Sequence, residues 1–259
     1  MGSGKKKKES LRGIIRRLGP GLITGASDDD PSGIATYAQA GAAFGPAFLW
    51  TALFTWPLMV SMQLMCARIG VVTRKGLMGV IKQYYPEWVS WLILFLTVPS
   101  IVLNISADLA AVGAVGNMLL PSIPAFLFSL LGSALLLYAI VKWNYQRIFR
   151  VLKWLCLALF CYLLIPFITE TNWEEALKNT FLPDIEWKPE YILMLTGILG
   201  TTISPYLFFW QTNMEVEDLR KKHLPHGKKS FALMDRDVRL GMVLSNLTFF
   251  FIILTSASV

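Results

Sequence analysis

The feature that most constrains this chain is a run of three carboxylates inside an otherwise apolar stretch. Residues 19–37 have the sequence GPGLITGASDDDPSGIATY, and the acidic residues at its centre are Asp28, Asp29 and Asp30. Pro31 lacks an amide proton and clashes with the preceding helical turn, while Gly33 tolerates backbone conformations that helices do not use. The stretch therefore predicts an apolar helix that is interrupted at its acidic centre.

The rest of the chain is apolar in blocks long enough to cross a membrane. Of its 259 residues, 54% are hydrophobic and 16% are charged, which is unusually apolar for a soluble domain. A helix needs about 20 such residues to cross about 30 Å of hydrocarbon. Seven blocks predict an all-α integral membrane protein with a transmembrane domain over residues 19–259. The spans are expected at about residues 20–43, 47–69, 88–119, 124–141, 148–168, 190–213 and 239–259.

The cations are confined to alternate loops. Residues 1–18 and the connections after the second, fourth and sixth spans are basic, whereas the loop at residues 169–190 is acidic. The positive-inside rule places the N-terminus in the cytoplasm and the acidic loop outside, as expected for a multi-pass protein of the plasma membrane. This confinement explains the net charge of +7 better than a nucleic-acid partner does.

The sixth span contains a second interruption, in the sequence TGILGTTISPYLFFW at residues 196–210. Unpaired backbone groups are costly in lipid, so such breaks persist where protein or a wet cavity surrounds them. Two broken spans, five apart in order, are typical of inverted-repeat transporters that bind substrate between half-helices. The alternative is a pair of proline kinks in a structural bundle. Three adjacent aspartates disfavour it, because one charge at mid-bilayer costs at least about 2.5–3.5 kcal/mol.

The polar groups at the two breaks favour a hard cation. Half-helix ends present free carbonyls, carboxylates add negative charge, and neutral oxygens come from Ser32, Thr201, Thr202 and Ser204. The broken segments contain no His, Cys or Met, the ligand types that softer transition metals prefer. An all-oxygen pocket favours Mg²⁺ or Ca²⁺ over Fe²⁺, Zn²⁺ or Cu²⁺, with Mn²⁺ between them.

Three motifs resemble the start of the Nramp divalent-metal transporters: GPG at 19–21, DPSGIATYAQAGAAFG at 30–45 and QLMCARIGVVTRKGL at 63–77. The resemblance implies a LeuT-like inverted-repeat fold with broken first and sixth transmembrane helices. In that family the first span carries Asp-Pro-Gly-Asn, and the sixth carries Met-Pro-His. A complete fold of this kind needs about 400 residues or more, so the remaining transmembrane helices are expected outside this chain, which stops inside its seventh span.

The family's metal ligands are carried over position by position. Its aspartate falls on Asp30 and its glycine on Ser32, and its asparagine ligand falls on Gly33. Its methionine falls on Ser204, and the residue that supplies a backbone carbonyl is Thr201. The amide and the thioether are thus replaced by smaller groups, which enlarges the site and removes its soft ligand. This pattern resembles the Nramp-related magnesium transporters and implies a partly hydrated Mg²⁺.

The third span bears on proton coupling. Its segment NISADLAAVGAVGNML resembles the family segment in which an aspartate and a glutamate, three apart, form the proton route. The aspartate falls on Asp108, but the glutamate position is Ala111, and the histidine of the sixth span falls on Tyr206. We therefore expect transport without proton coupling. The residues expected along the ion pathway are Asp108, Tyr206, and Asp28 and Asp29 at a wet entrance.

The predicted function is alternating-access transport of Mg²⁺, and also of Mn²⁺, across a lipid bilayer. The protein is expected to be no enzyme and to need no cofactor, because no nucleophile triad, metal-ligand cluster or phosphate loop is recognisable in the sequence. One alternative is a proton-coupled importer of Mn²⁺ or Fe²⁺, and another is an inactive relative of such importers. A third is a sodium-coupled carrier of a small organic solute, although the three aspartates would repel a substrate carboxylate. Gly21-x-x-x-Gly25 and Gly41-x-x-x-Gly45 are predicted to bring helices close together.

Overall fold

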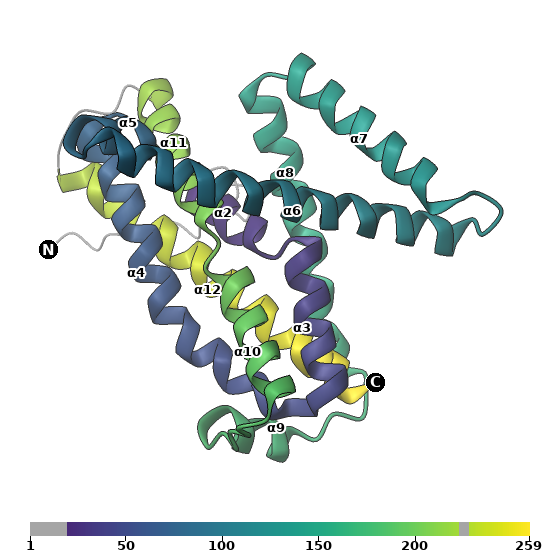
Figure 1. Ribbon diagram of the computed structural model, residues 1–259. Coiled ribbons are helices and arrows are strands. Elements are labelled where there is room, and N and C mark those ends of the chain that lie inside the picture. The colour runs from purple at the N-terminus through teal and green to yellow at the C-terminus, as the bar shows by residue number, and fades with distance from the viewer. Residues whose placement is uncertain (1–19, 223–227) are drawn as a thin grey trace, which may run out of the picture.

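The computed structural model describes residues 20–222 and 228–259, and these ranges contain helices and no strands (Figure 1). The basic segment at residues 1–18, which we predict to be cytoplasmic, lies outside the described residues. Each predicted span corresponds to a helix or to a pair of helices. The elements are α2 (Pro20–Asp28), α3 (Pro31–Phe44), η1 (Gly45–Phe48), α4 (Leu49–Thr73), α5 (Leu77–Tyr84), α6 (Glu87–Leu119), α7 (Ala125–Lys142), α8 (Tyr145–Leu164), η2 (Ile165–Phe167), α9 (Trp173–Phe181), α10 (Pro189–Thr202), α11 (Pro205–Lys222) and α12 (Lys228–Ser258).

Within the described ranges, five helical segments are long and apolar enough to cross a membrane. The first of them joins α3, η1 and α4 into one segment. They are Pro31–Thr73, Glu87–Leu119, Ala125–Lys142, Pro189–Arg220 and Phe231–Ser258. The all-α membrane fold is therefore confirmed.

Two predicted spans differ from the observed helices. The fifth corresponds to α8, which is not among the five apolar segments because Arg147, Arg150 and Lys153 lie in its first half. The seventh was expected from residue 239, but α12 already begins at Lys228. Its first turns are charged, so hydropathy alone misses them, and no glycine or proline there interrupts the helix. The short helices α5 and α9 lie between the apolar spans and were also not predicted.

Close contacts with α12 hold the first half of the broken span in place. A Cβ atom on Gly25 would lie 2.5 Å from the carbonyl carbon of Gly241, and one on Gly21 would lie 2.6 Å from the backbone of Val238. Small residues allow helix backbones to approach closely, which is the main device for helix packing in membranes. The predicted role of Gly21 and Gly25 is therefore confirmed.

In the second predicted glycine pair, Gly41 packs closely against another helix and Gly45 does not. Gly41 of α3 also packs against the backbone of α12, at Ile253 and Ala257. Gly45 does not pack against any helix, since a Cβ atom on it would have nothing within 4 Å. It ends α3 with a φ of 60°, a conformation that glycine adopts without a steric penalty. The close-packing prediction is therefore wrong for Gly45.

Side chains of α3 and α12 also meet in the largest buried cluster. Tyr37 stacks on Phe249 with ring centroids 4.2 Å apart, and both side chains are at most 1% exposed. Phe48 and Tyr191 stack in the same cluster at 4.3 Å, which brings α10 against η1. These contacts hold α3, α10 and α12 together near the broken spans.

In contrast, α6 and α7 form a hairpin that extends away from the other helices (Figure 1). Gly113 and Gly116 of α6 let α7 approach closely, against Ser129 and Phe128. The outward faces of the hairpin are strongly apolar; Phe95, Leu103 and Met118 are 75%, 71% and 80% exposed. Apolar surface of this extent is unusual for a soluble protein and is ordinary for one surrounded by lipid.

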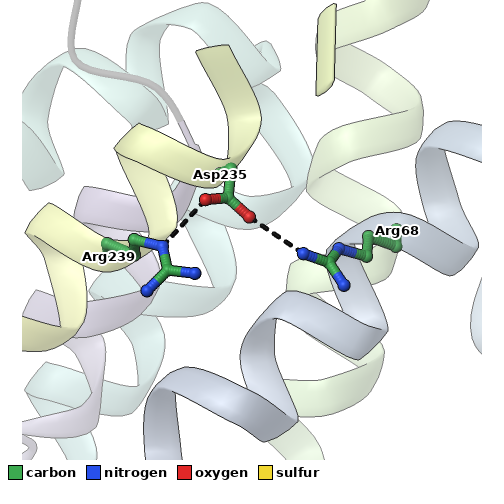
Figure 2. Close-up of polar contacts among 3 residues, drawn as sticks. All are labelled: Arg68, Asp235 and Arg239. Carbon is green, nitrogen blue, oxygen red and sulfur yellow. Dashed lines mark hydrogen bonds and ion pairs between the residues drawn. The ribbon is translucent and has the colours of Figure 1, made fainter. Parts of the chain in front are cut away.

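An ion-pair cluster links α4 to α12. Figure 2 shows Asp235 between two guanidinium groups, 2.8 Å from Arg239 on its own helix and 3.1 Å from Arg68 of α4. Both arginine side chains are more than half exposed. Exposed pairs of this kind contribute roughly 0–1 kcal/mol, so the cluster adds little to the stability of the contact between the two helices.

Candidate functional site

The first span is broken between α2 and α3, as the sequence predicts. Helix α2 ends at Asp28 and α3 begins at Pro31, with Asp30 as its N-cap residue in extended conformation (φ −76°, ψ 168°). Aspartate is a favoured N-cap residue, and proline is favoured at the first helical position because it has no amide proton to satisfy. The Asp30 carboxylate accepts hydrogen bonds from the Gly33 amide at 2.8 Å and the Ser32 hydroxyl at 2.7 Å.

The sixth span is broken in a similar way. Helix α10 ends at Thr202 and α11 begins at Pro205, so Ile203 and Ser204 lie between them. The Ser204 hydroxyl donates to the carbonyl oxygen of Thr201 at 2.6 Å, which satisfies one of the free carbonyls at the end of α10. The interrupted first and sixth helices are therefore both confirmed.

Hydrogen bonds between hydroxyl and carboxyl groups join the two breaks. The phenol of Tyr206, in the first turn of α11, donates to Asp30 Oδ2 at 2.7 Å. Helix α3 also contacts the end of α10. The Tyr37 hydroxyl lies 3.1 Å from Thr202 Oγ1 and accepts a hydrogen bond from Thr201 Oγ1 at 3.3 Å. Segments more than 160 residues apart in sequence thus meet at one polar centre.

Helix α6 contributes a third side to this centre. Asn104 Nδ2 donates to Asp30 Oδ2 at 2.8 Å, and Ser32 Oγ donates to Asn104 Oδ1 at 2.8 Å. The same nitrogen lies 3.5 Å from Asp108 Oδ2, one helical turn further along α6. We did not predict Asn104 as a site residue. The available signal was a polar side chain in an apolar span, one turn before Asp108.

The Asp30 carboxylate is the charged centre of this arrangement. Its two oxygens accept four hydrogen bonds, two within α3 and one each from α6 and α11. In the part of the chain that the structure describes, no three His, Cys, Asp or Glu side chains gather closely enough to hold a metal ion. The groups that contact Asp30 directly are hydroxyl and amide groups, and the Asp108 carboxylate lies behind Asn104. A cation bound beside Asp30 would therefore meet oxygen ligands.

The structure places the remaining predicted site residues as follows. Thr201 and Ser204 lie at the α10–α11 break, next to Tyr206, and Asp108 contacts the centre through Asn104. Gly33 lines the α2–α3 break, because a Cβ atom on it would lie 3.3 Å from the Asp28 carbonyl oxygen and 3.4 Å from Asp30 Oδ1. A side chain at position 33 would therefore occupy space beside the Asp30 carboxylate.

Asp28 and Asp29 differ from their expected place at a wet entrance. They are only 1% and 5% exposed. Asp28 Oδ2 accepts a hydrogen bond from Ser245 of α12 at 3.1 Å, whereas Asp28 Oδ1 and both Asp29 carboxyl oxygens have no hydrogen-bond partner. The close packing of α2 on α12 encloses the end of α2. The expectation of an exposed, wet entrance at these two residues is therefore wrong for this conformation.

Comparison with solved structures identifies the fold. The chain is similar to the manganese transporter of Eremococcus coleocola in complex with an aromatic bis-isothiourea substituted compound, with a TM-score of 0.76 and 17% identity. The similarity covers 99% of this chain and 54% of that one. A mutant of the same transporter gives a TM-score of 0.75 with 19% identity and the same coverage. The LeuT-like arrangement that we predicted is therefore confirmed.

Sequence comparison gives relatives of the same kind. The divalent metal cation transporter MntH of Burkholderia ambifaria is 25% identical over 259 residues, which is 97% of this chain and 57% of that protein. MntH of Bacillus subtilis is 26% identical over 246 residues, 92% of this chain and 56% of that protein. The chain thus spans little more than half the length of these relatives. Residues 21–259 match the family described as Natural resistance-associated macrophage protein-like, and the chain therefore belongs to the Nramp family.

Proposed function

We propose that this protein transports divalent cations across a membrane and that Asp30 is the charged ligand of the ion. The observation that carries the proposal is the position of Asp30, which caps the second half of one broken helix and accepts a hydrogen bond from the first turn of the other. A carboxylate at membrane depth is costly unless it has a function or a partner. Half-helices that meet at the bilayer midplane form the substrate sites of transporters with this architecture.

Family membership supports transport rather than catalysis. The similar proteins from Burkholderia ambifaria and Bacillus subtilis are divalent metal cation transporters, and the similar solved structures are of a manganese transporter. These names support a divalent cation as the substrate class. They also support Mn²⁺ as one of the transported ions.

We further propose Mg²⁺ as the main substrate, with Mn²⁺ as a second one. The ligands would be Asp30, the hydroxyls of Ser32 and Ser204 and the Thr201 carbonyl, with Gly33 leaving room for water. Serine at position 204 supplies an oxygen where a thioether would favour softer ions. Mg²⁺ loses its hydration shell reluctantly, so a roomy oxygen site that leaves some water in place suits it.

The hydrogen-bond network supplies a mechanism for ion capture. Without an ion, the Asp30 charge is balanced by donors that include the Ser32 and Tyr206 hydroxyls. A hydroxyl group can rotate, so it donates to a carboxylate or presents a lone pair to a cation. An arriving ion would therefore replace hydrogen bonds at Asp30 while the same oxygens become its ligands. This exchange would bind the α2–α3 and α10–α11 breaks to one ion, as alternating access requires.

We propose that transport is not coupled to protons. The glutamate of the family's proton route is absent at Ala111, and Tyr206 stands in place of its histidine. Inward movement of a divalent ion gains about 4.6 kcal/mol per 100 mV of membrane potential, from about 2.3 kcal/mol for each elementary charge. The potential and the concentration gradient together would be sufficient to drive uptake.

Ion uptake into liposomes tests this function. Vesicles that contain the protein and a Mg²⁺-sensitive dye should accumulate Mg²⁺, and Asp30→Asn should abolish uptake because it removes the charge and keeps the shape. Asp184→Asn is the matched control, since Asp184 lies away from both breaks, in the loop between α9 and α10. Equal fluxes through wild type and Asp30→Asn would refute the role of Asp30.

The same vesicles distinguish the second candidate function, a proton-coupled Mn²⁺ importer, for which the name of the similar manganese transporter supports the ion but not the coupling. A pH-sensitive dye in the lumen should record no acidification during Mg²⁺ or Mn²⁺ uptake. Ion-dependent acidification would refute the uncoupled mechanism. Uptake of Mn²⁺ without uptake of Mg²⁺ would refute the proposed selectivity.

A further inference from the structure

We propose that Asn104 of α6 is a further member of the ion site, where its amide nitrogen positions Asp30 and its amide oxygen is a ligand. This inference rests on the proposed function, since it adds a residue to the same site. It assigns a role to a side chain that we did not predict as a site residue.

The orientation of the Asn104 amide follows from its neighbours. Its Nδ2 faces two carboxylate oxygens, Asp30 Oδ2 at 2.8 Å and Asp108 Oδ2 at 3.5 Å. Carboxylates that are ionised only accept hydrogen bonds, so the amide nitrogen must face them. The opposite orientation would place the amide oxygen against Asp30 Oδ2 without a donor between them. Asn104 therefore holds its oxygen on the side of Ser32.

Three oxygens then share a single proton. Ser32 Oγ lies 2.7 Å from Asp30 Oδ1 and 2.8 Å from Asn104 Oδ1, and its hydroxyl has one hydrogen. At any moment, either the carboxylate oxygen or the amide oxygen lacks that hydrogen bond. A cation at this point would satisfy all three oxygens together. Amide oxygens are ordinary ligands of hard cations, and a neutral one adds coordination without adding charge.

The contact also connects α6 to the broken helix. Asn104 donates to Asp30 at the α2–α3 break, and its oxygen shares the Ser32 proton with Asp30 Oδ1. Asp108 lies behind it on the same helix, where Oδ1 is buried without a hydrogen-bond partner. Loss of the Asn104 amide would therefore loosen Asp30 from α6 and remove one oxygen from the site.

The test is the ion dependence of uptake by the protein in liposomes, with Mn²⁺ and Mg²⁺ each supplied alone. Asn104→Leu is close in shape and removes both amide groups. We expect it to raise KM for each ion about tenfold, equivalent to about 1.4 kcal/mol, and to leave the maximal rate within about threefold. Asn104→Gln keeps both the amide donor and the amide oxygen on a longer side chain, so its KM should lie clearly below that of Asn104→Leu. A purely structural role would instead lower the maximal rate or the melting temperature.

Asn117→Leu is the matched control, because Asn117 lies on the same helix and donates to the Ile123 carbonyl at the far end. It should leave KM unchanged. An unchanged or lowered KM in Asn104→Leu would overturn the inference, as would an Asn104→Gln variant as weak as Asn104→Leu. Wild-type vesicles that accumulate neither ion would refute the proposed function itself. Uptake that is lost in Asp30→Asn and normal in Asn104→Leu would refute the inference alone.

Discussion

The contact between α2 and α12 predicts that Gly25→Ala destabilises the protein. A Cβ atom on Gly25 would lie 2.5 Å from the carbonyl carbon and 3.0 Å from the Cα atom of Gly241. Both are backbone atoms of a helix, so no side chain can rotate to make room. Because Gly25 lies three residues before Asp28, displacement of α2 would also disturb the α2–α3 break.

The magnitude follows from the distance. Ordinary contacts between such atoms begin near 3.4 Å, so the helices must separate by about 1 Å. Excess volume in a well-packed interior costs about 1–3 kcal/mol. Replacing glycine by alanine in a helix stabilises that helix by up to about 1 kcal/mol, which offsets part of this cost. Because the obstructing atoms belong to a helix backbone, we take the upper end of that cost, about 3 kcal/mol. The net expected loss of folding free energy is then about 2 kcal/mol, which lowers Tm by about 4–8 °C for a chain of this size.

Thermal unfolding in detergent measures this effect. Gly200→Ala is the matched control, since it also lies in a half-helix but its Cβ atom would have nothing within 4 Å. It should leave Tm unchanged or raise it slightly through helix propensity. If Gly25→Ala melted at or above the wild-type temperature, close backbone packing of α2 on α12 could not be what holds the first half-helix.

Two further predictions concern selectivity and the ion-pair cluster. Ser204→Met places a thioether at the α10–α11 break, so the ratio of KM for Mg²⁺ to KM for Mn²⁺ should rise about tenfold in liposome uptake; an unchanged ratio would show that position 204 does not select the ion. Asp235→Asn removes both ion pairs of Figure 2 and should cost less than about 1 kcal/mol at low salt, because the arginines are more than half exposed. This loss in Tm should disappear in about 0.5 M salt, where exposed charges are screened, and a loss that persists there would show a buried role for Asp235.

The two breaks follow from the chemistry of a few neighbouring residues. Proline at positions 31 and 205 and the capping carboxylate of Asp30 interrupt their helices for local reasons, so the sequence predicts both interruptions closely. The start of α12 was missed by about eleven residues because its first turns are charged, and hydropathy detects burial in lipid rather than helix formation. For the same reason, the charged first half of α8 separates it from the apolar spans.

The contacts at the candidate site join residues that are distant in sequence. Asp30, Ser32 and Tyr206 meet at the two breaks, whereas the polar side chain of Asn104 in an apolar span gives no indication of which distant residues it contacts. The expected exposure of Asp28 and Asp29 was wrong, because burial depends on α12, a helix about 200 residues away. The local sequence around a carboxylate near a break is the same whether water or another helix covers the carboxylate, so it does not predict the burial of that group.

The sequence by itself determined the membrane class, the approximate positions of most apolar helices and the two interruptions. Each depends on composition, segment length or the backbone chemistry of proline and aspartate, which act over a few neighbouring residues. The tertiary structure alone decided which polar groups share the Asp30 carboxylate and which aspartates are enclosed. These outcomes depend on how closely α2, α6, α11 and α12 approach, and packing between distant helices is set by the shape of whole faces.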